Sequence, residues 1–303
     1  MKIAVLVLAH VDPDHIARLS KRVGAWADVF IHVDAKVDEK PFREKAAGLP
    51  NVYFSEKRYA CYWAGFSIVR ATIELIRNAT SRGRYDRVIF LMGLDYPIKT
   101  DLYILDFFEK HKTVEFIRGC RITGAKDAYF YRRARCLWFY DRINFIKRCI
   151  NKVNTLVPIL FRKDFTRTDG GERFEFFWGH AQWLLTGECA EYVLNFYDNN
   201  EKLNHYFQRT FSPDETYFTS IVLNSGYSRK TLHAGPEPLQ KYVRNWRNLH
   251  YFNYTGSTQF FTEADYETLV NDQALFCRKV NTKLSSKLLD MLDEDNRAVS
   301  PMS

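Results

Sequence analysis

The chain is 303 residues long and 46% hydrophobic, which is enough apolar material for one large domain or two closely fused lobes. It has no CxxC pair and no apolar run of the roughly 18–20 residues that cross a bilayer, which argues against a zinc site, a disulfide framework and a membrane-spanning helix. The net charge of +8 is concentrated in residues 118–167, where 13 Lys/Arg stand against 3 Asp/Glu, and this indicates an anionic partner or a solvated basic face.

The first hundred residues alternate strands with helices. Apolar runs predict strands at 3–9, 29–33, 51–55 and 87–92, and helical spacing predicts helices at 13–23 and 66–77. The predicted fold is therefore α/β, with a mostly parallel central sheet covered by helices on both faces. Ligands of such sheets bind beyond the carboxyl ends of the strands, where His10, Asp34 and Asp95 stand.

The middle of the chain predicts a basic amphipathic helix over residues 139–157, ended by Pro158. Such a helix can lie on an anionic membrane or pack on its own domain, and both interpretations stay open. Residues 176–185 predict a buried strand or loop, and 188–197 predict a helix.

The last third contains two helix starts. Ser212 is predicted to cap a helix that opens with Pro213, and Thr262 begins a capping-box-like sequence. We expect one domain over 1–293, with a nucleotide-binding half (1–110) and an acceptor-binding and catalytic half (111–293). Residues 294–303 are expected to form a flexible tail.

Several common binding motifs are absent from the sequence, namely GxGxxG, GxxxxGK[ST] and HExxH. Two Asp-x-Asp pairs occur, at Asp12-Pro13-Asp14 and Asp293-Glu294-Asp295, but an inner strand of a sugar transferase would end near Asp95, which offers one carboxylate. One acid is a weak start for an octahedral magnesium site, so no metal ion is predicted.

Cations near the C-terminus could replace a metal. Arg278-Lys279 follows the apolar stretch 274–277, and Arg244 and Arg247 flank Trp246. Paired cations of this kind can stabilise the diphosphate that leaves when a nucleotide gives up a sugar, or they can be ordinary surface charges.

Seven short stretches resemble the core-2/I-branching glycosyltransferases, which include β-1,6-N-acetylglucosaminyltransferases and proteoglycan xylosyltransferases. In chain order they are Leu6–His10, Ile31–Asp34, Trp63–Ser67, Leu91–Thr100, Gln182-Trp183, Ser212–Glu215 and Leu275–Lys279. The resemblance implies a GT-A-like fold without a metal-binding acidic pair, and an inverting reaction on a UDP-sugar with no further cofactor.

The resemblance also implies roles for individual residues. Glu215 would be the general base, with its pKa raised by desolvation; otherwise it only favours a helix N-terminus. Asp34 would hold the uridine or ribose, and Trp63 would line the donor pocket unless it is a core residue. The remaining donor-binding residues are expected to be Leu8, Asp95, Arg247 (with Arg244 as the fallback), Arg278 and Lys279.

Gln182 and Trp183 would line the acceptor site, or they pack in the core. Where the family has Gly-Ser before this pair, the chain has His180-Ala181. Asp95 has a second interpretation as a residue that orders the loop before Pro97, and His10 and His32 are expected to be structural.

We expect a cytoplasmic, bacterial-type enzyme of surface-polysaccharide synthesis, peripheral at the inner face of the membrane. Its acceptor would be a glycan or a polyprenyl-diphosphate-linked saccharide, and segment 118–167 would face an anionic membrane surface. The alternative is a basic, aromatic nucleic-acid- or membrane-binding protein without transferase activity. The sequence contains no RNP, KH or helix-turn-helix signal, so no nucleic-acid partner is expected.

Overall fold

The apolar runs of the first hundred residues form most of a five-stranded sheet in the order β3-β2-β1-β4-β8. The computed structural model describes residues 1–157, 168–239, 248–253 and 258–299. Strands β1 to β4 are parallel, and β8, from much later in the chain, joins β4 antiparallel. The predicted mostly parallel sheet is thus confirmed. The strands are β1 Ile3–Ala9, β2 Asp28–Val33, β3 Val52–Phe54, β4 Arg87–Met92 and β8 Leu184–Thr186.

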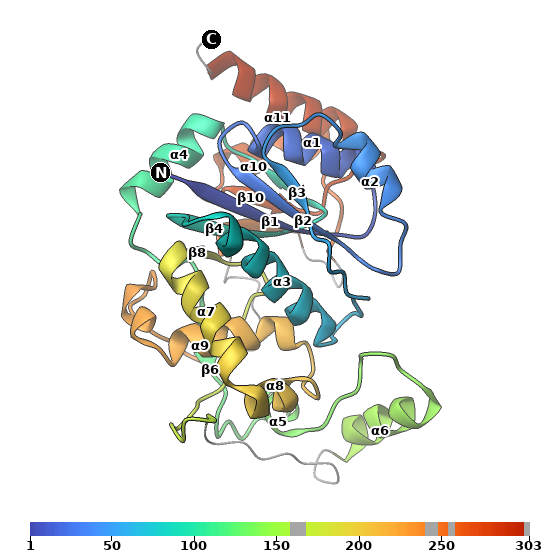
Figure 1. Ribbon diagram of the computed structural model, residues 1–303, viewed down its shortest axis with the longest axis vertical. Coiled ribbons are helices and arrows are strands. Elements are labelled where there is room, and N and C mark those ends of the chain that lie inside the picture. The colour runs from blue at the N-terminus through green and yellow to red at the C-terminus, as the bar shows by residue number, and fades with distance from the viewer. Residues whose placement is uncertain (158–167, 240–247, 254–257, 300–303) are drawn as a thin grey trace.

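Two apolar cores lie on opposite faces of this sheet, because successive side chains of a strand point to opposite sides. Along β1, the residues Ile3, Val5 and Val7 contribute to one core, whereas Leu6 and Leu8 contribute to the other. Helices α1, α4, α10 and α11 cover the first face, and α3, α7, α8 and α9 cover the second (Figure 1). Their bounds are α1 Pro13–Val23, α3 Ser67–Arg82, α4 Asp101–Lys110, α7 Gly187–Asn199, α8 Glu201–Phe207, α9 Tyr217–Leu223, α10 Tyr266–Asn271 and α11 Ser286–Val299.

Two smaller sheets extend the fold beyond the central one. Strand β10 (Phe276–Arg278) pairs antiparallel with β5 (Asp95–Pro97) and parallel with β9 (His250–Phe252). Strand β6 (Gly119–Arg121) pairs antiparallel with β7 (Phe177–Gly179). Strands β8 and β10 both pair with strands of the first hundred residues, β8 in the central sheet and β10 in the sheet with β5. Both predicted halves of the chain therefore contribute strands to the same two sheets. Further helices in the described ranges are α2 Lys40–Lys45, α5 Ala128–Arg135, α6 Phe145–Leu156, and the 3-10 turns η1 Pro213–Glu215, η2 Gly226–Lys230 and η4 Glu263–Asp265.

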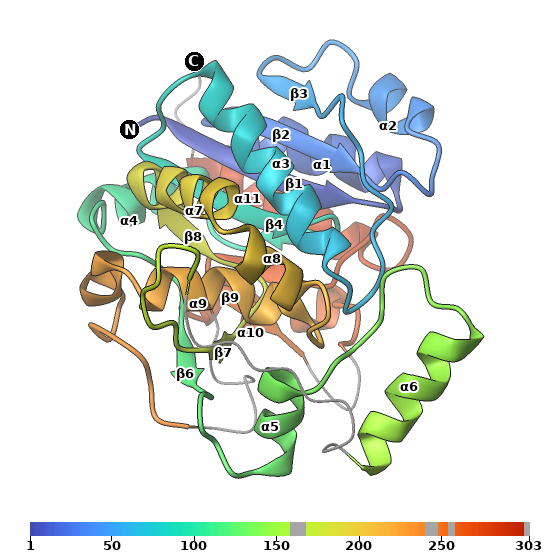
Figure 2. The same cartoon turned by 60° about the horizontal axis from the view of Figure 1, so that its bottom comes forward.

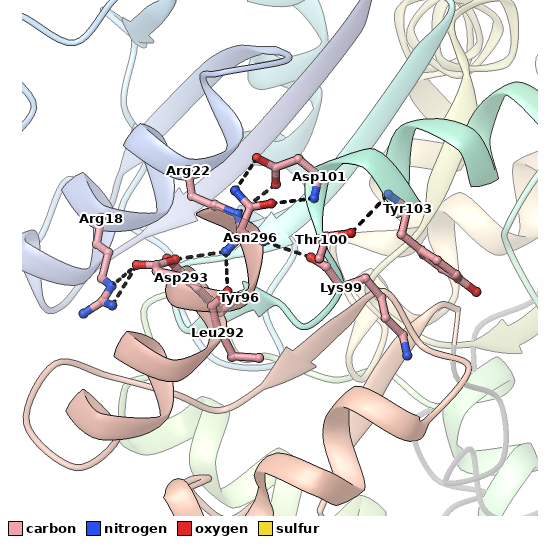
Figure 3. Close-up of polar contacts among 10 residues, drawn as sticks. All are labelled: Arg18, Arg22, Tyr96, Lys99, Thr100, Asp101, Tyr103, Leu292, Asp293 and Asn296. Atoms are coloured by element: carbon pink, nitrogen blue, oxygen red, sulfur yellow. Dashed lines mark hydrogen bonds and ion pairs between the residues drawn. The ribbon is translucent and has the colours of Figure 1, made fainter. Parts of the chain in front are cut away.

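Residues 294–299 of the predicted tail are helical, because α11 continues to Val299. Figure 3 shows the charged contacts that hold this helix on the fold. Asp293 accepts hydrogen bonds from Arg18 Nε (2.8 Å), Arg22 Nη1 (2.9 Å) and the Tyr96 hydroxyl (2.7 Å). One turn further, Asn296 exchanges two hydrogen bonds with Asp101.

The predicted helix starts have mixed outcomes. The capping box at Thr262 is confirmed, with Asp265 as its reciprocal partner. The predicted cap by Ser212 is wrong, because this residue has a left-handed backbone (φ 44°) and its side chain makes no cap hydrogen bond. The middle helix is shorter than predicted and begins at Phe145 instead of residue 139. In the described ranges, none of the helices combines the length and apolar character of a membrane-crossing segment.

Candidate active site

A group of charged side chains gathers where β1, β2 and β10 end. His10 follows β1 and keeps an exposed edge; its partial burial and the charge of Arg278 lower the pKa of its imidazole. Asp34 opposes this shift, and Lys36 and Lys279 add to it. Because one histidine senses all these charges, residues far apart in the sequence share one edge of the fold, as the strand-end pattern predicts.

Asp34 follows β2 and is largely buried. Its Oδ1 accepts hydrogen bonds from the backbone N–H of Lys36 (2.9 Å) and of Cys61 (3.2 Å), and its Oδ2 lies 3.4 Å from Lys36 Nζ. The carboxylate therefore orders the loop that brings Trp63 to the site. His32, by contrast, is structural, since its Nε2 accepts the Tyr59 N–H and burial lowers its pKa to about 4.

Asp95 is fully buried and paired with Arg278. The two residues stand opposite each other in the β5–β10 pair, and Arg278 Nη1 donates to Asp95 Oδ1 at 2.8 Å. Asp95 Oδ2 accepts from the Met92 N–H (2.8 Å) and lies 3.5 Å from His250 Nε2. Because neither oxygen is accessible, we assign Asp95 to positioning Arg278 and the loop before Pro97, not to contacting a donor.

Lys279, the neighbour of Arg278, makes no ion pair with any described residue, and its Nζ lies 5.8 Å from the centroid of the Phe260 ring. Burial, and then the charge of Arg278, lower the pKa of this amine. Two adjacent cations that repel each other form a place where an anion is stabilised. Arg247 and its fallback Arg244, also predicted to contact the donor, lie outside the described residues.

Glu215 ends η1 and is held by an indole. Trp178 Nε1 donates to Glu215 Oε2 at 2.8 Å. Burial raises the pKa of Glu215, although the charge of Arg133 and the Trp178 hydrogen bond both lower it. The predicted direction of this shift is confirmed. Next to it, burial and the charge of Glu215 raise the pKa of Asp214 to about 7.

Arg133 was not predicted as a site residue. Its guanidinium lies over the rings of Tyr129 (3.9 Å), Phe211 (4.9 Å) and Trp178 (5.2 Å), which are cation–π distances. The sequence places it in the basic segment, but a basic segment does not say which cation lies beside a carboxylate.

Trp63 is exposed, with 75% of its surface accessible, so it is not a core residue. Its indole meets the rings of Tyr140 (centroids 5.6 Å apart) and Phe211 (5.9 Å) edge to face. The Phe211 ring also lies under the Arg133 guanidinium, and Phe211 directly precedes the Ser212–Glu215 stretch. A flat aromatic surface thus lies beside the segment that holds Glu215.

Strand β7 joins the two groups of charged residues. Trp178 Nε1 donates a hydrogen bond to Glu215. Two residues later, burial and then the charges of His250 and Arg278 lower the pKa of His180 to about 4, against the Gln182 hydrogen bond and Asp95. Between them, a Cβ on Gly179 would lie 2.1 Å from the Arg118 carbonyl oxygen, so only glycine allows β7 to approach β6. Glu215 is thus linked to this segment through the Trp178 indole, and Arg278 through its charge effect on His180.

Three predicted site residues contribute to the core instead. Trp183 is fully buried between Phe90 and Phe218, with ring centroids 5.4 Å away on both sides. Gln182 is buried beside it, and Leu8 packs in the core under α3. None of them offers surface to a sugar, so the predicted acceptor contacts of Gln182 and Trp183 and the donor contact of Leu8 are not assigned.

The Asp-x-Asp carboxylates serve protein contacts. Asp12 caps α1 and binds Thr282, and Asp14 pairs with Lys45 at 2.7 Å. Asp293 holds Arg18 and Arg22, while Asp295 accepts from Tyr266. In the part of the chain that the structure describes, no three His, Cys, Asp or Glu side chains form a metal site.

A hollow of about 600 Å³ lies between α1 and α11. None of the predicted site residues lines it.

Comparison with known proteins identifies the family. The model of the Core-2/I-Branching enzyme family matches residues 28–265. The chain is 23% identical to a bovine beta-1,3-galactosyl-O-glycosyl-glycoprotein beta-1,6-N-acetylglucosaminyltransferase, over 97% of this chain and 69% of that protein. It is 29% identical to the Drosophila melanogaster xylosyltransferase oxt and 23% identical to a Ciona intestinalis xylosyltransferase, over 92% and 87% of this chain.

These matches cover 31% and 30% of the two xylosyltransferases, so the chain spans under a third of their length. The sheet topology is consistent with a GT-A-like arrangement, and the family membership replaces the alternative of a binding protein without transferase activity. The chain therefore belongs to the Core-2/I-branching enzyme family and is a glycosyltransferase.

Proposed function

We propose that this glycosyltransferase moves a sugar from a UDP-sugar to a hydroxyl group of a glycan or a lipid-linked saccharide, with inversion and without a metal ion. The observation that supports this most is that segment 178–180 contacts a carboxyl of raised pKa, Glu215, at Trp178, and lies within the electrostatic influence of Arg278, the neighbour of Lys279, at His180. A one-step displacement requires a base for the acceptor and a group that stabilises the departing charge.

In the proposed step, Glu215 removes the proton of the acceptor hydroxyl as its oxygen attacks the anomeric carbon. The bond between that carbon and the β-phosphate oxygen breaks, and UDP leaves with the electron pair. Arg278 and Lys279 stabilise the charge that develops on the diphosphate. The proton stays on Glu215 until solvent removes it.

Residues around each group would support this reaction. Asp95 accepts a hydrogen bond from Arg278, so the Arg278 guanidinium is oriented before the substrate arrives. Asp34, at the end of β2, is the proposed contact of the uridine or ribose, as the family resemblance implies. The exposed Trp63 indole, together with Tyr140 and Phe211, offers a flat surface for a sugar ring beside Glu215.

The proposal extends to the cellular role. Synthesis of a bacterial surface polysaccharide on the cytoplasmic side of the membrane would supply acceptors of the proposed class.

A UDP-release screen tests the proposal. The full chain is incubated with UDP-N-acetylglucosamine, UDP-xylose, UDP-galactose and UDP-galactofuranose, with and without EDTA, and products are identified by intact mass. We expect UDP release from at least one donor at a rate that EDTA leaves unchanged. Loss of activity with EDTA and its recovery with magnesium would show that a metal holds the diphosphate instead of Arg278 and Lys279.

A further inference from the structure

Helix α6 turns polar side chains toward the protein. Asn151 exchanges two hydrogen bonds with the backbone of Phe139 (2.9 and 3.0 Å), and Asn154 donates to the Leu137 carbonyl. Lys147 Nζ donates to the carbonyls of Asp141 and Arg142 at 3.1 Å each. At 3.6 residues per turn, these three side chains share one side of the helix. That polar side faces the rest of the fold.

The opposite side of α6 is apolar, basic and open to solvent. Phe145, Ile146 and Leu156 have 80%, 68% and 72% of their surface exposed, and Arg148 and Lys152 are exposed beside them. A helix on a globular protein normally buries its apolar residues, and α6 half-buries Ile150 and Val153 but leaves these three large apolar side chains exposed. Both cartoon views show α6 standing away from the sheet and its covering helices (Figures 1 and 2).

The charge of this region selects the kind of partner. Residues 142–157 contain four Lys/Arg and no Asp or Glu. A twofold contact with a second copy through this face would bring like charges together. A bilayer with anionic lipid offers an apolar interior for Phe145 and Leu156 and phosphates for the flanking cations. We propose that the outward face of α6, formed by Phe145, Ile146, Arg148, Lys152 and Leu156, docks on the surface of a bilayer that contains anionic lipid.

Segment 137–142, whose backbone accepts hydrogen bonds from α6, also contacts the edge of the candidate active site. Tyr140 packs against Trp63, and Asp141 accepts a hydrogen bond from the Ser67 hydroxyl at 2.6 Å. Docking would therefore bring the aromatic surface near Glu215 close to the lipid. For a lipid-linked acceptor, a consequence that rests on the proposed function, the hydroxyl group would arrive from the bilayer side.

Vesicle co-sedimentation of the full chain tests the docking without any substrate. We expect binding to phosphatidylcholine vesicles only when they contain phosphatidylglycerol, and weaker binding at high salt because exposed charges are screened. Phe145→Ser should weaken binding about tenfold, from the lost burial of one aromatic side chain. Arg148→Ser with Lys152→Ser should weaken it about fivefold per charge.

Matched variants at the other end of the molecule serve as controls. Lys21→Ser with Arg297→Ser removes the same two charge types from exposed positions on α1 and α11, and Tyr103→Ser removes an exposed aromatic ring from α4. These variants should bind the vesicles like the unchanged chain.

Three results would overturn the proposal: equal binding to vesicles of phosphatidylcholine alone, an equal loss of binding in the control variants, or self-association in sedimentation equilibrium that Phe145→Ser abolishes. The last result would assign the face to a second copy of the chain. UDP release with a soluble acceptor is measured separately on the same variants, so failure of the proposed reaction and failure of lipid docking are distinguishable.

Discussion

Asp95 is fully buried and Glu215 is half-buried, and the pKa values of their carboxyl groups are shifted in opposite directions. Burial acts to raise both. At Asp95 the Arg278 charge at 2.8 Å, with His250, outweighs burial and lowers the pKa. At Glu215 a neutral indole donor and the Arg133 charge do not outweigh it. An ion pair with a cation on the paired strand thus favours the ionised form of Asp95, whereas at Glu215 burial outweighs the Arg133 charge and favours the protonated form.

The largest effect is expected from Glu215→Gln, which keeps the hydrogen bond from Trp178 but removes the base. Turnover should fall about 10²–10⁴-fold, the usual contribution of a general base. UDP affinity, measured by titration calorimetry, should stay the same because the diphosphate lies with Arg278 and Lys279. A variant that retains turnover within a factor of a few would show that Glu215 is not the base. The raised pKa of Glu215 would then have no role in catalysis.

Asp95→Asn should destabilise the fold by about 3 kcal/mol, because it leaves the partly buried Arg278 without its anion. Denaturant unfolding measures this. The folded-state pKa of Asp95 is lowered, so its stabilising effect is present above the unfolded value of roughly 4 and is lost as the pH falls through the folded value. The difference between the variant and the unchanged chain should accordingly shrink in acid.

Asp214→Asn provides the matched control with the opposite sign. Burial and Glu215 raise the pKa of Asp214 to about 7, so its contribution to stability is complete below roughly pH 4 and is lost as the pH rises through 7. At pH 8 the variant should therefore be more stable by roughly 1 kcal/mol, and at pH 3 the gain should vanish. Destabilisation at pH 8 would mean that the Asp214 carboxylate has a stabilising partner.

Lys279→Ala should weaken UDP binding about tenfold, as expected for one lost charge-assisted contact. Since Lys279 has no ion-pair partner among the described residues, the midpoint of unfolding should not move. Lys21→Ala on α1 is the control. Unchanged UDP affinity in Lys279→Ala would place the diphosphate elsewhere.

The smallest effect concerns the pH profile. Glu215 acts as a base only when ionised, so activity should rise with pH through its pKa. The Trp178 hydrogen bond lowers that pKa, and Trp178→Phe should move the acid limb to higher pH by about one unit or less. A shift to lower pH would mean that Trp178 does not stabilise the ionised form.

Features that depend on neighbouring residues in the chain could be predicted from the sequence. Strand 3–9, helix 13–23 and strand 87–92 have the predicted bounds, because a solid apolar run or a helical period is a local property. The same holds for the capping box at Thr262. Glu215, Arg278 and Lys279 became candidates because short stretches around them resemble a family, which is also information carried by the chain itself.

Contacts between distant residues were decided by the tertiary structure. Helix α11 is held on the fold because Arg18, Arg22 and Tyr96 meet Asp293. Helix α6 is held by hydrogen bonds of Asn151 and Asn154 to the backbone at 137–139, and part of its apolar surface is exposed. Likewise Trp183 is a core residue and Trp178 the partner of Glu215, although both are tryptophans of one aromatic segment. Local pattern determined the elements of this protein, whereas the burial and charge of each site residue depended on which elements packed against it.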